Sequence, residues 1–452
     1  MGALSIRGVS RRATHAMGLF SGTQALGILC SVVRTKLVAI WVGQTGIGLL
    51  AILNAAVELL SSVGQLSIRT TSVRLVSLAD GKSDAPRSCR QISRSAILFA
   101  AVCGTGGLLL SPLLSRITFG DYSHTLTFAI LSVALILNTI VAARQGMLQG
   151  LGRLGDLARG TVMASTLSLV ITIPLIYFLR LNSIVVVILT YSVVTAAAYF
   201  IPRRMKIPML PASQISRMEY ANTRSRLISF GGWLTAAGGI TWLCEYIFMA
   251  WLRGEAGEGM VGLYQAGHTL TVKYVGIVFT AMAMEYYPRI TVSSASSRRM
   301  SVFASHELGL VLKIAIPVAL LFMAVVPWVV SLLYSSDFLP ITEFVRIDIP
   351  ATMLRAASWC LGFVILARGE GPVFTFTECI SACTALLLNI VFYRHWGLTG
   401  LGVAYLATYS VYTPLVALIV ARRYRVTLSN KAILLLAVSF ILTFLTAVGM
   451  MS

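Results

Sequence analysis

Apolar runs of about 20 residues recur along almost the whole sequence, and they restrict the folds open to the chain. A transmembrane α-helix needs about 20 mostly apolar residues, and 57% of the chain is hydrophobic while only 12% is charged. We therefore predict an all-α polytopic membrane protein. The predicted spans are 16–41, 47–68, 95–116, 124–148, 161–180, 183–202, 227–252, 260–285, 306–334, 343–367, 372–393 and 399–421, with a candidate thirteenth at 432–450.

Basic residues give the chain a net charge of +20. Most of them fall before the first predicted span and in alternate segments between or after the spans, among them the loops 69–94, 149–160 and 203–226, while the intervening loops are short and carry few. This alternation follows the positive-inside rule, so we expect the N-terminus and the basic loops on the cytoplasmic side of the membrane. The surplus charge therefore does not indicate nucleic-acid binding.

Two sequence patterns recur in the two halves of the chain. They are a tryptophan followed by a Gly-rich turn, at Trp41 to Gly48 and Trp251 to Gly262, and the matching segments Thr190-Tyr-Ser-Val-Val194 and Thr408-Tyr-Ser-Val-Tyr412. An even number of spans per half gives both halves the same orientation, as in parallel-repeat transporters. We predict two six-helix lobes around a central cavity, at 1–202 and 227–425, joined by a cytoplasmic linker at 203–226, with 426–452 as a candidate additional C-terminal transmembrane helix.

Ionisable and polar residues inside the spans are the strongest functional candidates, because a charge at mid-membrane is costly unless it meets water, an anion or a partner. Lys273 lies in the middle of the span 260–285. Helical spacing places Gln265, Thr269 and Lys273 on one face. His268 also lies on this polar stripe, where substrate binding and a hydrogen-bonded structural role are both open. We expect this stripe to bind substrate.

When the two halves are aligned on Gly48 and Gly262, charged residues at corresponding positions in the spans have opposite signs. Arg34 and Lys36 fall near the depth of Glu245, and Glu58 falls near that of Lys273. Because membrane helices do not bury ionisable groups against lipid, we expect these helices to face a cavity. For any single residue the alternative is an ion pair that only locks two helices together.

The spans 343–367 and 372–393 carry a further set of charges. Asp348 lies near the outer end of the first, Arg355 lies deeper, and Glu378 is in the second. The planar guanidinium of an arginine can donate two hydrogen bonds at once to a phosphate. Arg355 is therefore a candidate ligand for a phosphorylated substrate.

The sequence shows no signature of an enzyme. It has no P-loop, nucleophile elbow or HExxH motif, and its five histidines and seven cysteines show no metal-binding spacing. All outer loops are short, which leaves little room for a catalytic site there. We predict no catalytic residue, metal or cofactor.

Four segments together resemble a known family: RTKLVAIWVGQTGIGLL at 34–50, VGLYQA with Tyr287-Pro-Arg289, LGFVILARGEGPVFTFTECIS at 361–381, and TGLGVAYLATYSVY with ARRYR at 399–425. They are similar to the Wzx-type oligosaccharide-lipid flippases of the multidrug/oligosaccharidyl-lipid/polysaccharide exporter (MOP) superfamily, nearest to those for O-antigen and enterobacterial common antigen. The resemblance implies that the protein moves an undecaprenyl-pyrophosphate-linked oligosaccharide from the cytoplasmic to the periplasmic leaflet of a bacterial inner membrane. It implies membrane lipids and polysaccharide polymerase or assembly proteins as partners.

The same resemblance implies a cationic cavity that receives the pyrophosphate and the sugars. Lys36, Lys273 and Arg355 match basic positions of that cavity, and Arg34 is a neighbour of the first. Asp348 matches an acidic position of the family. The predicted substrate-binding residues are thus Arg34, Lys36, Gln265, His268, Lys273 and Arg355, and the candidates for ion coupling or structural ion pairs are Glu58, Glu245, Asp348 and Glu378.

Three alternatives remain open at this point. A cation-coupled multidrug antiporter of the same superfamily would need an acidic, aromatic cavity, against which the intramembrane bases argue. A lipid II flippase and a non-transporting scaffold are the others. The driving force is also open: a carboxylate of the coupling set could admit a proton or sodium ion, or downstream consumption of the polymer could draw the flux.

Overall fold

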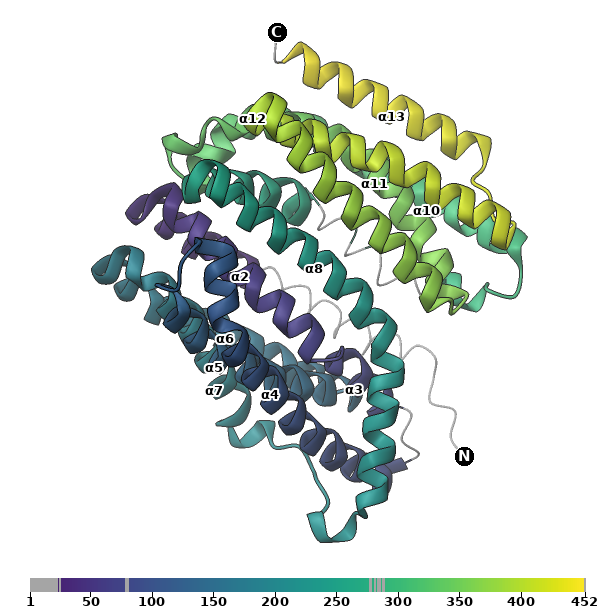
Figure 1. Ribbon diagram of the computed structural model, residues 1–452. Helices are drawn as coiled ribbons and strands as arrows, with labels where there is room; N and C mark the ends of the chain where they lie inside the picture. Colours follow the sequence, from purple (N-terminus) through teal and green to yellow (C-terminus); the bar gives the residue numbers. More distant parts are fainter. Residues whose placement is uncertain are drawn as a thin grey trace. The chain divides into compact units, whose positions relative to one another are not determined.

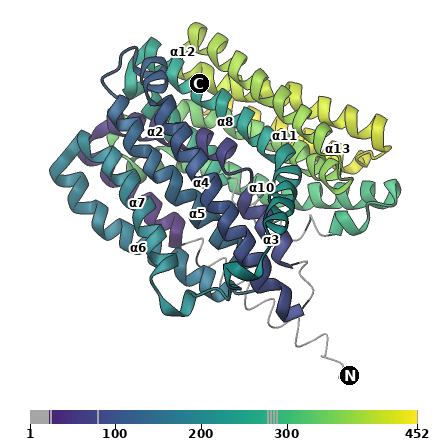
Figure 2. The same ribbon diagram turned by 60° about the horizontal axis from the view of Figure 1, so that its bottom comes forward.

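The computed structural model describes residues 23, 26–77, 81–275, 279, 282, 286 and 289–450, and its regular elements are all helices (Figure 1, Figure 2). They are a helix over 26–41, α2 Gly43–Gly64, α3 Ile68–Ser77, α4 Gly81–Phe119, α5 Thr125–Gly150, α6 Leu154–Leu179, α7 Ser183–Phe200, α8 Arg217–His268, α10 Ser297–Leu333, α11 Ile341–Ala367, α12 Gly371–Tyr424 and α13 Asn430–Gly449. Eight helices of this part are long and apolar enough to cross a membrane, or up to nine if a bent pair counts as one span. The chain is an all-α polytopic membrane protein, as predicted.

The segment 69–94, predicted as a loop, is instead largely helical. It contains most of α3 and the first turns of α4. The buried residues of α3 are Ile68, Thr71, Ser72 and Val76, and this spacing marks one face of an amphipathic helix. The basic residues of the segment make it polar overall, and this polarity masks the helical spacing of its apolar residues.

Three pairs of predicted spans are joined by breaks with positive φ. The breaks lie at Arg180 between α6 and α7, at Gly257 inside α8 and at Gly397 inside α12, with φ of 49°, 81° and 58°. Each falls in a turn that the sequence predicts. Glycine adopts this conformation without a steric penalty. Arg180 does not, and its Nη1 donates to the carbonyl of Trp41 at 2.9 Å, which fixes the turn.

The chain divides into two compact units. The N-terminal unit contains Met1–Val42 and Ile52–Gly239, and the C-terminal unit contains Gly43–Ala51 and Ile240–Ser452. The first part of α2 therefore belongs to the C-terminal unit and the rest of α2 to the N-terminal unit.

Within the C-terminal unit, Gly48 and Gly262 lie against each other. A Cβ at Gly48 would overlap the carbonyl oxygen of Glu258, and a Cβ at Gly262 would overlap the carbonyl oxygen of Gln44. Each of these carbonyls lies four residues before the opposite glycine, so the contact is reciprocal. Such self-complementary contacts are what a two-fold relation between equivalent segments produces. The two glycines on which the sequence repeat aligns thus form one close helix crossing, which only small residues permit.

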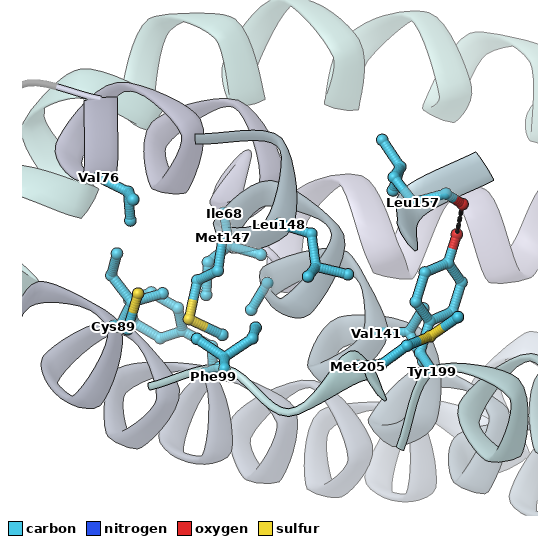
Figure 3. Close-up of a cluster of buried hydrophobic side chains, with 14 of the residues drawn as sticks. Ile68, Val76, Cys89, Phe99, Val141, Met147, Leu148, Leu157, Tyr199 and Met205 are labelled. Atoms are coloured by element: carbon cyan, nitrogen blue, oxygen red, sulfur yellow. Dashed lines mark hydrogen bonds between the residues drawn. The ribbon is translucent and has the colours of Figure 1, made fainter. Parts of the chain in front are cut away.

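The core of the N-terminal unit contains buried residues from α3, α4, α5, α6 and α7. Figure 3 shows Ile68, Phe99 and Met147 with other members of this cluster. The hydroxyl of Tyr199 donates to the carbonyl of Leu157 at 3.0 Å. Buried polar groups of this kind are expected to be hydrogen-bonded.

Arg144 of α5 is a second buried polar group in this unit. Its Nε donates to the carbonyl of Tyr199 at 2.7 Å, and its Nη2 donates to that of Met205 at 2.8 Å. Its guanidinium also lies 4.3 Å from the centroid of the Phe200 ring. Arg144 therefore binds the end of α7 and the segment that follows it, which is a structural role for an intramembrane base.

The core of the C-terminal unit joins α10, α11 and α12, and α13 packs against α10 and α11. Figure 1 shows α13 running alongside these helices. Ser301 and Ser305 of α10 accept hydrogen bonds from the backbone of Thr427 and Ser429 at 3.1 and 2.8 Å. Arg346 of α11 donates to the carbonyl of Met450 at 2.9 Å. The additional C-terminal helix predicted from the sequence is thus present and fixed at both ends.

The turn between α11 and α12 carries the ion pair of Glu370 with Arg423. Nε of Arg423 donates to Oε2 of Glu370 at 2.8 Å. This hydrogen bond is the largest cause of the lowered pKa of Glu370. The pair joins the two ends of α12 at one side of the unit.

Candidate functional site

In the N-terminal unit, three helices hold Arg34. Its Nη2 donates to Oγ of Ser168 in α6 at 2.9 Å, and its guanidinium lies 5.0 Å from the centroid of the Tyr191 ring in α7. Its Nε is buried without a hydrogen-bond partner. A charged donor left unused inside a membrane unit is costly, so Arg34 is poised to donate to an acceptor that enters from outside.

Lys36 lies two residues further on the same helix and is partly buried. Residues two positions apart on a helix do not face each other. The structure therefore does not place Lys36 on the same face as Arg34.

Glu58 of α2 lines a polar pocket in the N-terminal unit. The pocket has a volume of about 430 Å³ and lies between α2, α5, α7 and α8. Its wall includes Asn138 and Tyr191, so the same tyrosine contacts both the pocket and Arg34. Glu58 is exposed in this unit, as expected for a residue that faces an aqueous space.

In the C-terminal unit, Arg355 of α11 lies among aromatic groups, Tyr405 of α12 and Phe279. Its Nη1 donates to the hydroxyl of Tyr405 at 3.4 Å, and its guanidinium lies 5.6 Å from the centroid of the Phe279 ring. Glu378 attracts it electrostatically, and Oε1 of Glu378 accepts a hydrogen bond from Tyr412 at 2.9 Å. The structure thus groups two of the predicted residues, Arg355 and Glu378, in one network.

Asp348 is almost completely buried, with 1% of its surface exposed. Its Oδ2 accepts a hydrogen bond from Thr271 at 2.9 Å, whereas its Oδ1 has no partner. An isolated ionised carboxylate in such a place would be very unfavourable. A proton or a cation at Oδ1 would therefore stabilise Asp348.

Tyr264 connects Glu245 to His268. Its hydroxyl donates to Oε1 of Glu245 at 3.3 Å and lies 3.5 Å from Nδ1 of His268. Its ring stacks on Phe344 of α11 at a centroid distance of 6.3 Å. Tyr264 lies within electrostatic range of both Glu245 and Asp348, so these two predicted acids belong to one polar region of the C-terminal unit.

Two residues of the predicted polar stripe, Gln265 and Thr269, are in contact. Nε2 of Gln265 donates to Oγ1 of Thr269 at 3.1 Å, so these residues share a face. From Thr269 to Val275 the chain forms a π-helix, η4, instead of continuing as an α-helix. Beyond Thr269 the face given by 3.6-residue spacing therefore does not apply. The Lys273 side chain lies outside the described residues, and its role stays a prediction.

The sequence analysis missed the tyrosines that organise the C-terminal unit. Tyr264, Tyr405 and Tyr412 each bond to one of the predicted charged residues. Their spacing contained the signal: Tyr264 lies four residues before His268, and Tyr405, Tyr409 and Tyr412 recur at helical intervals. A buried tyrosine needs a hydrogen-bond partner, so such a row beside intramembrane charges predicts contact with them.

Across the described ranges, no three His, Cys, Asp or Glu residues gather into a group that could hold a metal ion. The acids of the C-terminal unit, Glu245, Asp348 and Glu378, instead accept hydrogen bonds from tyrosine or threonine hydroxyls. Such an arrangement can bind and release a proton or a weakly held cation, while the arginines can bind an anion.

Solved structures of similar fold come from the MOP superfamily. One is an inward-facing multidrug resistance MATE family transporter, with 12% identity, a TM-score of 0.72, and coverage of 88% of this chain and 94% of that one. A second is the lipid II flippase MurJ in an inward closed conformation, with 12% identity, a TM-score of 0.72, and coverage of 94% and 92%. A third is a MOP superfamily transporter from Pyrococcus furiosus, with 15% identity, a TM-score of 0.63, and coverage of 90% and 95%. At these identities the likeness shows a shared fold.

Among curated protein sequences, none matches this chain. A family match does exist: the sequence matches the polysaccharide biosynthesis protein family over residues 42–343, about two thirds of the chain. This match and the shared fold confirm the resemblance found in the sequence. The chain therefore belongs to the polysaccharide biosynthesis protein family and has the fold of the MOP superfamily transporters.

Proposed function

We propose that the protein is a flippase that moves an undecaprenyl-pyrophosphate-linked oligosaccharide from the cytoplasmic to the periplasmic leaflet of a bacterial inner membrane by alternating access. Membership of a polysaccharide biosynthesis family supports a glycan substrate. A glycan such as an O-antigen unit or a unit of enterobacterial common antigen fits this proposal, with polymerase and assembly proteins as later partners. The N-terminus would be cytoplasmic, in keeping with the positive-inside rule.

The observation that carries the proposal is the state of Arg34. This arginine lies inside a membrane unit, is held over Tyr191, and keeps a buried Nε without an acceptor. A pyrophosphate supplies such an acceptor and cannot cross hydrocarbon without polar contacts that replace its water. Arg355 would serve the same purpose in the C-terminal unit, with Lys36 and Lys273 as further bases.

Asp348 is the proposed coupling residue. Its unpartnered Oδ1 supports the uptake of a proton or a sodium ion during each transport cycle. Glu245, held by Tyr264, would assist in the same region. The alternative driving force is consumption of the product by a polymerase, which requires no titrating group. A transport rate that is independent of the proton and sodium gradients would favour this alternative.

The experiment is leaflet transfer of undecaprenyl-pyrophosphate glycan lipids in proteoliposomes. We expect transfer by the wild type and at least a tenfold loss in Arg34→Ala and Arg355→Ala at equal folded yield. The matched control is Lys313→Ala, which removes an exposed base of α10. An equal loss of transfer in Lys313→Ala would show that transfer depends on the net charge of the protein and not on the arginines of the proposed site.

A multidrug antiporter is the second candidate. It is favoured by the partly buried acids Glu245 and Glu378 of the C-terminal unit, which lie among tyrosine rings, because such a setting can hold an organic cation. The same proteoliposomes decide between the two functions. Export of cationic dyes against a proton or sodium gradient, without transfer of glycan lipid, would contradict the flippase and establish the antiporter.

A further inference from the structure

The polar pocket of the N-terminal unit differs from the other groups of the site in its chemistry. Residues from four helices form its wall, among them Glu58, Ser61, Asn138, Tyr191 and Thr235. They contribute hydroxyls, an amide, a carboxylate and an aromatic ring. No lysine or arginine is among the described residues that line it. The pocket is therefore not built to hold a phosphate.

One group in the wall points to a missing ligand. Oγ of Ser61 is buried without a hydrogen-bond partner, and only 7% of Ser61 is exposed. Other hydroxyls of the wall are bonded within the protein: Ser62 donates to the carbonyl of Leu59 at 2.8 Å, and Ser67 lies 3.1 Å from Thr235. Because a buried hydroxyl rarely stays unbonded, Ser61 is the group that an occupant of this pocket would satisfy.

The volume of the pocket decides what size of occupant fits. About 430 Å³ lies within the range of sites for small organic molecules, roughly 300–1,000 Å³. One water takes about 30 Å³ in the liquid, so a bare cation would fill only a small part of the space. The pocket thus fits an organic group better than an ion.

A sugar matches this wall group by group. Each sugar hydroxyl both donates and accepts, and so do the serine hydroxyls and the amide of Asn138, while Glu58 accepts. The ring of Tyr191 offers an apolar face with a polar tip, which suits the C–H face of a pyranose. The carboxylate of Glu58 would repel a pyrophosphate. These properties select the uncharged part of a lipid-linked glycan.

The position of Arg34 gives the order of the groups along the substrate. Its guanidinium lies over the Tyr191 ring, and Tyr191 also lines the pocket. We propose that this pocket binds the sugar next to the pyrophosphate while Arg34 binds the pyrophosphate itself, so that the N-terminal unit recognises the junction of the two. The inference rests on the proposed flippase function and adds to it a separate glycan subsite.

The test compares two probes on the purified full-length protein in nanodiscs. One is undecaprenyl pyrophosphate, and the other is the pool of undecaprenyl-pyrophosphate glycan lipids extracted from the native cells. We expect the wild type to bind the glycan lipids at least tenfold more tightly. Asn138→Leu should remove most of this difference and leave the binding of the sugar-free probe unchanged. The matched control Asn222→Leu makes the same change at an exposed residue of α8 and should have no effect.

A second variant keeps the test valid if Asn138→Leu folds poorly. Ser61→Ala removes a hydroxyl that has no partner in the protein, so folding should not suffer. We expect a several-fold weaker binding of the glycan lipids and an unchanged thermal midpoint. A lower midpoint with unchanged glycan binding would mean that Ser61 holds a water, and would overturn the inference.

Other results separate the inference from the proposed function. If the wild type binds neither probe, the flippase function fails and the glycan subsite fails with it. If the wild type transfers glycan lipids but both pocket variants bind them as tightly as the wild type, only the subsite is refuted. Loss of sodium binding in Glu58→Gln with glycan binding intact would identify a cation site instead and would also refute it.

Discussion

The two units follow a related helical pattern but hold their charged residues in opposite ways. In the N-terminal unit, Arg34 rests on a tyrosine ring and Glu58 lines a pocket of about 430 Å³. In the C-terminal unit, Asp348 is almost completely buried, and tyrosine hydroxyls hold Glu245 and Glu378. The first arrangement is suited to receiving a ligand, and the second is suited to controlling the protonation of acids.

The difference shows which structural features the two halves share through the sequence repeat and which they do not. The reciprocal contact of Gly48 with Gly262 depends only on the absence of side chains, so both halves keep it. The chemistry of each unit depends on single polar residues, which can change without altering the backbone. A shared helical scaffold can therefore hold an open pocket in one unit and a buried acid in the other.

The largest expected effect concerns the glycine contact. Gly48→Val and Gly262→Val should each destabilise the protein by about 3 kcal/mol or more, because the new side chain overlaps a carbonyl that cannot move freely. Since the contact is reciprocal, the two losses should be similar. The measurement is the thermal midpoint and the monodisperse fraction in detergent. The control is Gly309→Val, at a glycine of α10 with open space around it. A large loss in only one of the two variants would contradict the symmetric relation.

Next in size is the effect of neutralising the buried acid. Asp348→Asn keeps the volume of the side chain but cannot bind a proton or cation in the same way. We expect the transport rate in proteoliposomes to fall about tenfold, equivalent to 1.4 kcal/mol, and to lose its dependence on an imposed proton or sodium gradient. Asp337→Asn, an exposed acid of the same unit, should change neither quantity. Full gradient dependence in Asp348→Asn would remove Asp348 from the coupling mechanism.

The sequence predicted the architecture because long apolar runs leave few alternatives in a membrane. It placed the breaks at Arg180, Gly257 and Gly397 in the correct turns and identified the helix that became α13. It also grouped Gln265 with Thr269. These results depend on hydrophobicity and local spacing, which a single sequence contains.

The arrangement of the site was less predictable. Spacing along one helix could not show that Tyr264 would connect Glu245 to His268, or that Thr271 would bond only one oxygen of Asp348. The pocket beside Tyr191 joins side chains from four helices, so its wall depends on tertiary packing. The π-helix at Thr269–Val275 also changed a period that the prediction had assumed to be constant. Contacts between distant segments and local changes of winding account for what was missed.

A smaller effect separates Tyr264 of the C-terminal unit from Tyr191 of the N-terminal unit. Tyr264→Phe removes the hydroxyl that bonds Glu245 and keeps the ring that packs on Phe344. It should lower stability by about 1 kcal/mol. Tyr191→Phe should leave stability nearly unchanged, because Arg34 contacts the ring and not the hydroxyl. Thermal midpoints of the two variants in detergent measure the difference. Equal losses would contradict the view that the units hold their charges differently.

The smallest effect concerns the solvent-accessible ion pair of Glu370 with Arg423. The hydrogen bond from Arg423 lowers the pKa of Glu370 below its unfolded value, so the pair stabilises the folded state at neutral pH. This contribution should disappear as the pH falls through the lowered pKa, because the carboxyl is then protonated in both states. Exposed pairs contribute little. Glu370→Gln should therefore lower the thermal midpoint slightly at pH 7 and not at all at low pH.

The matched control for this last change is Glu343→Gln, at an exposed acid in the first turn of α11. Glu343→Gln should not lower the thermal midpoint at pH 7, so there should be no loss for acidification to remove. If Glu370→Gln behaved in the same way, the turn between α11 and α12 would be held by Gly369, whose φ of 75° suits a glycine, and by backbone hydrogen bonds. The charges that matter for stability in the C-terminal unit would then be confined to its buried polar region, which would sharpen its contrast with the open pocket of the N-terminal unit.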